Sequence, residues 1–180
     1  MNAQLAYMLE DKNMFSVAPD EIGQFTSDLT MYSIPFSMVT TFLVSYLFEI
    51  WGRRFTIVIS YVLTAGAYFI LPYSAPNYSN LMVIRCVIAI TMSAPISHPL
   101  VADYVKRSSR GKAIAFAGVG IVLGEVFSMG ILFNLTKSMN YYDAFAIAAG
   151  LIFMFSMFFL VALKEPDMEN IRDNMSSKHM

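Results

Sequence analysis

The chain has 180 residues, of which 57% are hydrophobic and only 14% are charged. In soluble domains about 45–50% of residues are hydrophobic and about 25% are charged. Lys and Arg nearly balance Asp and Glu, and the net charge of −1 leaves no field that would gather nucleic acid. The single cysteine, Cys86, excludes an internal disulfide and a thiolate metal site. This composition is typical of a membrane protein, whose first partner is the lipid bilayer.

Taken in chain order, residues 1–24 form a polar N-terminal segment with five charged side chains, too polar to span a membrane. Residues 25–163 then contain five long apolar stretches, and residues 164–180 form a polar tail. A bilayer core of about 30 Å needs about 20 helical residues. We therefore predict an all-α membrane protein with five transmembrane helices, spanning about 28–48, 55–75, 81–102, 113–136 and 144–163. The alternative, a soluble protein with five buried helices, is disfavoured because 180 residues cannot cover so many.

The orientation follows from the distribution of basic residues, because loops rich in Lys and Arg stay in the cytoplasm. With five spans, two basic residues lie on the N-terminal side, namely Lys12 and Lys137. Nine lie on the other side: Arg53, Arg54, Lys106, Arg107, Arg110, Lys112, Lys164, Arg172 and Lys178. We predict an N-terminus outside and a tail in the cytoplasm, or on the matrix side in an organelle.

The five spans differ in polarity. Spans 55–75 and 144–163 carry no charge and are expected to face lipid over most of their surface. Span 81–102 carries Arg85, His98 and two prolines, and span 113–136 carries Glu125. A charge inside a membrane normally faces a bundle interior or water, so these two helices are expected to lie inward.

Several interpretations of the intramembrane polar residues remain open. Arg85 could lean inward to pair with Glu125, or extend outward to the lipid headgroups. His98 could be a hydrogen-bonded interior residue or a proton carrier. Gly120 and Gly124 form a small-xxx-small face, which is usual for helix packing.

Four sequence features, in order, resemble the N-terminal half of the major facilitator superfamily. Residues 45–54, Ser-Tyr-Leu-Phe-Glu-Ile-Trp-Gly-Arg-Arg, resemble the Gly-x-x-x-Asp-Arg-x-Gly-Arg-Arg loop that joins helices two and three of that family. Arg85 stands where the family has an arginine in helix four. Residues 103–111 resemble its Glu-x-x-Pro-x-x-x-Arg-Gly loop, which is closest to the sugar-porter and organic-ion branches. Lys164-Glu165-Pro166 is similar to the motif after helix six.

The resemblance implies an incomplete six-helix bundle, containing helices two to six only. The sequence departs from the family pattern at Ser45, Glu49, Ile50 and Lys106. The loop residues that the resemblance marks as functional are Glu49, Gly52, Arg53, Arg54, Asp103, Arg110, Gly111 and Glu165. It also implies that Asp103 bonds Arg53 or Arg54 and that Glu165 bonds Arg110. The alternative is a set of cytoplasmic anchors without such bonds.

Two functions are compatible with the sequence. The first is part of a secondary transporter for a small polar solute, completed by other membrane chains or segments, with Arg85, His98 and Glu125 as its intramembrane polar residues. The second is a structural membrane subunit of a larger complex, derived from a carrier fragment, that transports nothing. An enzyme is not expected, because the sequence has no metal-ligand spacing and no glycine-rich phosphate loop. For the same reason we expect no cofactor and no metal.

Overall fold

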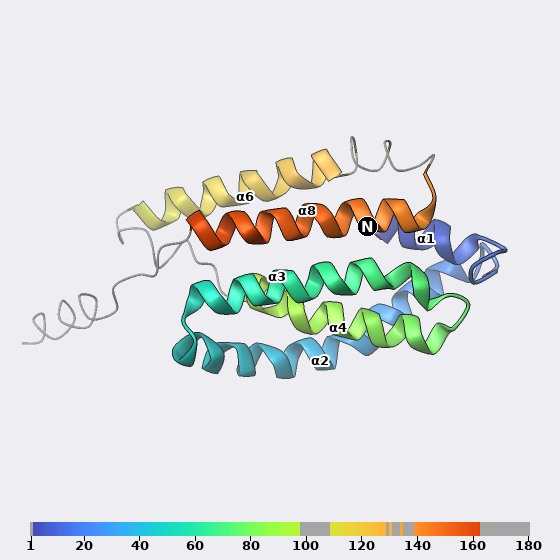
Figure 1. Cartoon of the computed structure of the whole chain (residues 1–180), viewed down its shortest axis with the longest axis horizontal. Coiled ribbons are helices and arrows are strands. Elements are labelled where there is room, and N and C mark those ends of the chain that lie inside the picture. The colour runs from blue at the N-terminus through green and yellow to red at the C-terminus, as the bar shows by residue number, and fades with distance from the viewer. Residues whose placement is uncertain (1, 98–108, 129, 131–133, 135–138, 163–180) are drawn as a thin grey trace, which may run out of the picture.

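The computed structural model describes residues 2–97, 109–128, 130, 134 and 139–162, and this part of the chain is helical, without a strand. Its long helices run roughly along one common axis, and helices that follow one another in the chain are antiparallel (Figure 1). The elements are α1 (Asn2–Glu10), α2 (Ile22–Ile50), α3 (Arg53–Ile70), the short 3-10 helix η1 (Leu71–Ser74), α4 (Tyr78–Ser97), α6 (Arg110–Phe127) and α8 (Tyr141–Ala162). All-α architecture is confirmed.

The centre of the bundle is α3, which packs against both α4 and α8, whereas α2 packs mainly against α4. Half of the apolar span of α3 is buried (50%), compared with 6% for α2 and 28% for α8. The expectation that the charge-free span 55–75 faces lipid over most of its surface is therefore wrong. Its inward face carries small and hydroxyl side chains, among them Ser60, Thr64 and Ala65, which allow neighbouring backbones to approach closely.

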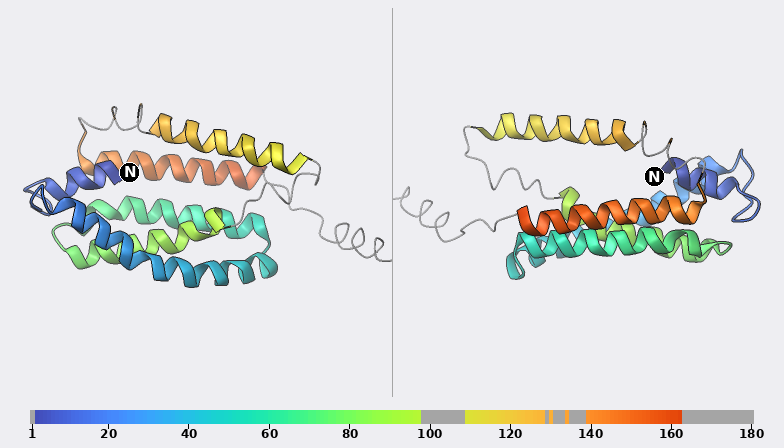
Figure 2. Two further views of the ribbon diagram at one scale, coloured as in Figure 1. Left: turned by 180° about the vertical axis from the view of Figure 1, so that it is seen from behind. Right: turned by 45° about the horizontal axis from the view of Figure 1, so that its top comes forward.

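The helix that carries Glu125, α6, was expected to lie inward, and within the described residues this expectation is also wrong. It lies apart from the packed helices, on the side of α8, and has no buried residue (Figure 2). Its 18 residues thus have almost no neighbour to pack against. The charge of Glu125 predicted a need for a partner, but the described part of the chain does not supply one.

The distribution of side chains is that of a protein in lipid. Large apolar residues cover the exterior, and Phe42, Phe116 and Val161 are each at least 80% exposed. In contrast, Thr64 and Ser156 are completely buried. In water this arrangement would leave a very large apolar surface uncovered. Within the described residues, three helices are long and apolar enough to cross a membrane: Ile22–Phe48, Arg53–Ser74 and Tyr141–Val161. A fourth apolar helix, Tyr78–Ser93, is shorter.

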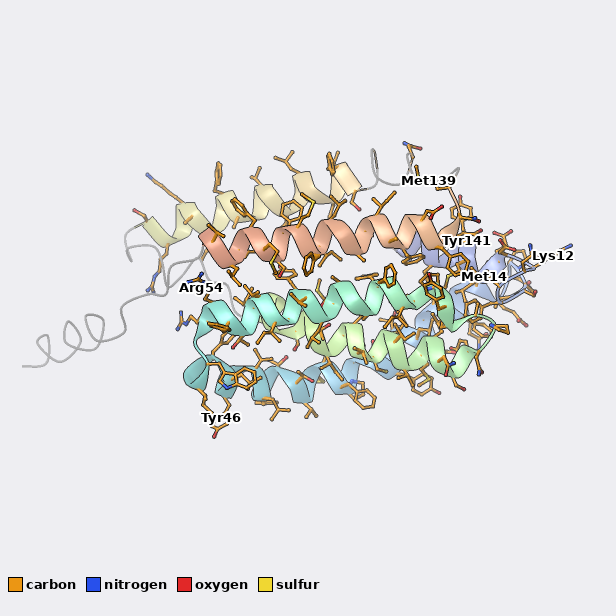
Figure 3. All side chains as sticks on the ribbon, in the orientation of Figure 1. Lys12, Met14, Tyr46, Arg54, Met139 and Tyr141 are labelled. Atoms are coloured by element: carbon orange, nitrogen blue, oxygen red, sulfur yellow. The ribbon has the colours of Figure 1, made fainter. Side chains whose placement is uncertain are left out.

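The N-terminal segment contributes to the core, which its polar composition did not predict. Leu5, Met8 and Leu9 of α1 are at most 1% exposed. They pack at one end of the bundle with Leu29, Leu71, Leu81 and Phe145. The first residue of α8, Tyr141, holds this segment: its hydroxyl donates to the Tyr7 carbonyl oxygen at 3.3 Å, and it interacts electrostatically with the Asp11 carboxylate. Tyr141 and Met14 lie together at this end in Figure 3.

Candidate functional site

Arg85 lies in α4, in the half of the helix nearer its N-terminus. Its side chain is partly buried, and its charge acts on the phenol of Tyr68 in α3. Tyr68 in turn packs against the core formed with α1. Arg85 is therefore placed beneath the end of the bundle that α1 covers. His98, the second polar residue predicted for this span, lies outside the described residues.

Glu125 lies near the end of α6 and is exposed. Among the described residues neither Arg85 nor Glu125 takes part in an ion pair. The interpretation in which Arg85 leans inward to pair with Glu125 is therefore not supported. Around Glu125 the helix is open: a Cβ atom built on Gly118, Gly120 or Gly124 would meet nothing within 4 Å. A carboxylate that faces lipid from an apolar helix costs free energy. A partner that donates a hydrogen bond to it would lower this cost.

A buried cluster of hydroxyl groups joins α3 to α4. The Ser60 hydroxyl donates to the Thr91 carbonyl oxygen. The Thr64 hydroxyl oxygen lies 2.7 Å from the Thr91 hydroxyl oxygen and 2.8 Å from the Ser60 carbonyl oxygen. Thr91 can in turn donate to the carbonyl oxygen of Val87 at 3.0 Å, within its own helix. Lipid offers no alternative partners, so these bonds favour one register between the two helices.

On its opposite side α3 is joined to α8 by weaker polar contacts and by aromatic packing. The buried Ser156 hydroxyl donates to the Val58 carbonyl oxygen at 3.4 Å. Tyr61 and Phe159 stack with ring centroids 5.6 Å apart. Along the middle of α3, the contacts with both of its neighbours are thus made by uncharged side chains.

The turn between α2 and α3 contains the best-matched part of the first loop motif. Gly52 has φ of 77°, in the left-handed region that favours glycine. This conformation lets α2 end and α3 begin at once with Arg53. The Thr56 hydroxyl, one turn into α3, donates to the Gly52 carbonyl oxygen at 2.9 Å. Glu49 lies in the last turn of α2.

Arg54 connects this turn to the far end of the chain. Its Nη2 donates to the carbonyl oxygen of Leu160, in the last turn of α8. The last carbonyl groups of a helix have no partner within the helix and carry partial negative charge, so a guanidinium group there is favourable. Arg54 lies at the opposite end of the bundle from Lys12 and Tyr141 (Figure 3).

Only the last residues of the second loop motif, from Ser109 onward, belong to the part of the chain that the structure describes. Arg110 and Gly111 begin α6, with Ser109 in the preceding cap position. Asp103 and Glu165 lie outside the described residues, so the predicted bonds from Asp103 to Arg53 or Arg54, and from Glu165 to Arg110, stay predictions. The structure adds a role for Arg54 that the resemblance did not imply.

Sequence reasoning did not identify the hydroxyl groups that hold α3 in the centre. A signal was present, because Thr56, Ser60 and Thr64 recur every four residues and therefore share one face of the helix. Charges and prolines, which predicted that other helices face inward, are not needed for such a face. In lipid, a face of small hydroxyl residues is an equally good indication of helix contact.

The helices and the apolar exterior define an all-α integral membrane protein. The family model described as Major Facilitator Superfamily matches residues 4–178, nearly the whole chain. The chain therefore belongs to the major facilitator superfamily, whose members are transporters, and a transporter type of function follows. Comparison with the curated proteins and with the solved structures gives no match.

Proposed function

We propose that this chain forms helices two to six of a secondary transporter for a small polar solute, and that other membrane chains or segments complete the carrier. The five spans would be those predicted from the sequence, with the N-terminus outside and the tail in the cytoplasm. One observation carries this proposal: α6 is apolar, has no buried residue and exposes Glu125. A helix of this kind is stable in a membrane when a further helix covers it.

The proposal makes α6 a contact surface for the missing part of the carrier. Its glycines leave room for a close approach, because nothing lies within 4 Å of a Cβ atom built at Gly120 or Gly124. A partner helix could therefore pack tightly on this face and offer a hydrogen-bond donor to Glu125. Arg85 in α4 and the motif residues at the α2–α3 turn would then belong to the same assembled bundle.

The experiment is mass spectrometry of the chains that copurify with the full-length protein in mild detergent. A split carrier predicts a partner that supplies further transmembrane helices of the same superfamily. Gly124→Leu should reduce its recovery, because the larger side chain fills the open face of α6. Gly150→Leu, on α8 and equally open, is the matched control and should leave recovery unchanged. Recovery of unrelated membrane subunits instead would favour the structural role.

A further inference from the structure

The segment before α2 folds over one end of the bundle. α1 lies beside the first turns of α8, at the end where α2 and α4 also begin (Figure 1). Leu5, Met8 and Leu9 are at most 1% exposed, because they pack into the core formed with α2, α4, η1 and α8. Met14, in the turn that follows α1, is buried in the same core. This end of the bundle is therefore covered by residues that belong to none of the long helices.

Residues 2–17 form a unit with its own internal hydrogen bonds. The backbone N–H of Val17 donates to the Leu9 carbonyl oxygen at 2.9 Å. The backbone N–H of Ser16 donates to the Asp11 carbonyl oxygen at 3.1 Å. These bonds fold the turn back against α1 and do not involve the bundle. They would therefore persist if the unit moved as one body.

The unit is attached to the rest of the chain in a way that allows such a movement. Residues 18–21 join it to α2, through a turn in which the Glu21 N–H donates to the Ala18 carbonyl oxygen at 2.9 Å. On the bundle side, the Tyr141 hydroxyl donates to the Tyr7 carbonyl oxygen at 3.3 Å. The remaining described attachment is the apolar core. Apolar packing is non-directional, so a contact of this kind can separate and form again.

Arg85 lies at the end of the bundle that this unit covers. It follows Leu81 by four residues and precedes Ile88 by three, so it shares the face of α4 that these two core residues occupy. Its side chain is partly buried, and its charge acts on Tyr68, which also packs against the core. The next residue, Cys86, is partly buried as well. The unit thus lies between this part of α4 and the water beyond the end of the bundle.

We propose that residues 2–17 are a lid, hinged at residues 18–21, that closes this end of the bundle against water and shields the region of Arg85. The burial of Leu5, Met8 and Leu9 makes the closed form predominate. Lifting the lid admits water to the region of Arg85, together with any solute that enters the carrier from this side. This last step, the entry of solute, rests on the proposed function, whereas the closure itself does not.

The test uses Cys86, the single cysteine of the chain, as a reporter of water access. An impermeant maleimide reacts with a thiolate in water and not with a thiol that protein or lipid covers. The full-length protein is held in lipid nanodiscs, which expose both ends of the bundle, so the result does not depend on orientation. The reference is the variant Asn77→Cys with Cys86→Ser, because Asn77 is exposed. Cys86 of the unaltered protein should react about tenfold more slowly than this reference, or slower still.

A substitution in the lid should change this rate, because reaction requires opening and follows the fraction of the open form. Leu9→Ala removes buried apolar groups from the closed form and should raise the rate at Cys86 about tenfold or more. Leu63→Ala is the matched control: it makes the same change on the exposed surface of α3 and should leave the rate unchanged.

A second reporter separates movement of the lid from opening of the whole bundle. Ser60→Cys with Cys86→Ser places the thiol in the buried hydroxyl cluster, and it should stay unreactive with or without Leu9→Ala. Fast reaction of Cys86 in the unaltered protein, or a rate that Leu9→Ala does not change, would overturn the lid. A parallel rise at both reporters would overturn it too, because the bundle would then open as a whole.

Discussion

At the residue scale, Gly52 is the position where the backbone itself restricts the choice of side chain. Its φ of 77° is costly for any residue with a Cβ atom. We expect Gly52→Ala to lower the free energy of unfolding by about 1–3 kcal/mol, because φ of 77° with ψ of 166° is a conformation that only glycine adopts readily. Gly66→Ala should have the opposite sign, because Gly66 is helical and a Cβ atom there meets nothing within 4 Å. Thermal unfolding in detergent measures both, and equal effects would contradict this reading of the turn.

Glu125 tests the intramembrane chemistry at the same scale. If the assembled carrier moves its solute together with protons, Glu125→Gln should abolish the dependence of solute uptake on a proton gradient, because the amide cannot exchange a proton. Folding should be unchanged, since the side chain is exposed in this chain. Uptake into proteoliposomes at several external pH values is the measurement, with Glu21→Gln as the control. Unaltered proton coupling in the Glu125 variant would remove this residue from the mechanism.

At the scale of elements, the buried hydroxyl cluster is expected to couple α3 to α4. Thr64→Val and Thr91→Val each remove a partner from the contact at 2.7 Å. In a double-mutant cycle we expect a coupling free energy of about 0.5–1.5 kcal/mol. Thr30→Val, on the exposed part of α2, should cost little, because its hydroxyl bonds only the Thr26 carbonyl of its own helix. Additive effects of the two buried substitutions would show that the hydroxyl groups do not cooperate.

Arg54 is the corresponding link between α3 and α8. Arg54→Gln should lower the free energy of unfolding by about 1–2 kcal/mol, because the last carbonyl groups of α8 lose a charged donor. Lys112→Gln removes a positive charge from an exposed position near the start of α6 and is the matched control. Chemical denaturation of both variants in the same detergent provides the comparison. If both variants lost the same free energy of unfolding, Arg54 would contribute only through its positive charge and not through the bond to Leu160.

At the scale of the whole molecule, the orientation in the membrane is open to a direct test. Cysteines introduced at Asn77 and Asn140, with the native Cys86 replaced by Ser, should react with an impermeant maleimide added outside. A cysteine at Ser109 should be protected, because the excess of Lys and Arg predicts that this loop is cytoplasmic. Labelling at Ser109 together with protection at the other two positions would reverse the orientation.

The sequence alone was sufficient for the fold class and the superfamily. Long charge-free stretches force a chain in lipid to satisfy its backbone by helix formation, so element type follows from composition and length. The loop motif around Gly52 and the two arginines was equally visible, because it depends on a local backbone conformation. Both features depend only on residues that are close together in the sequence.

Only the tertiary structure decided which helix is central and what the polar residues contact. The contact of Thr64 with Thr91 joins residues 27 positions apart, and that of Arg54 with Leu160 joins residues 106 positions apart. The same is true of Leu5 and Met8, whose burial depends on an apolar core formed by α2, α4 and α8. Local pattern does not encode which surfaces meet, because many pairs of apolar helices can pack. The choice falls to small differences in shape and hydrogen bonding that exist only when the helices are together.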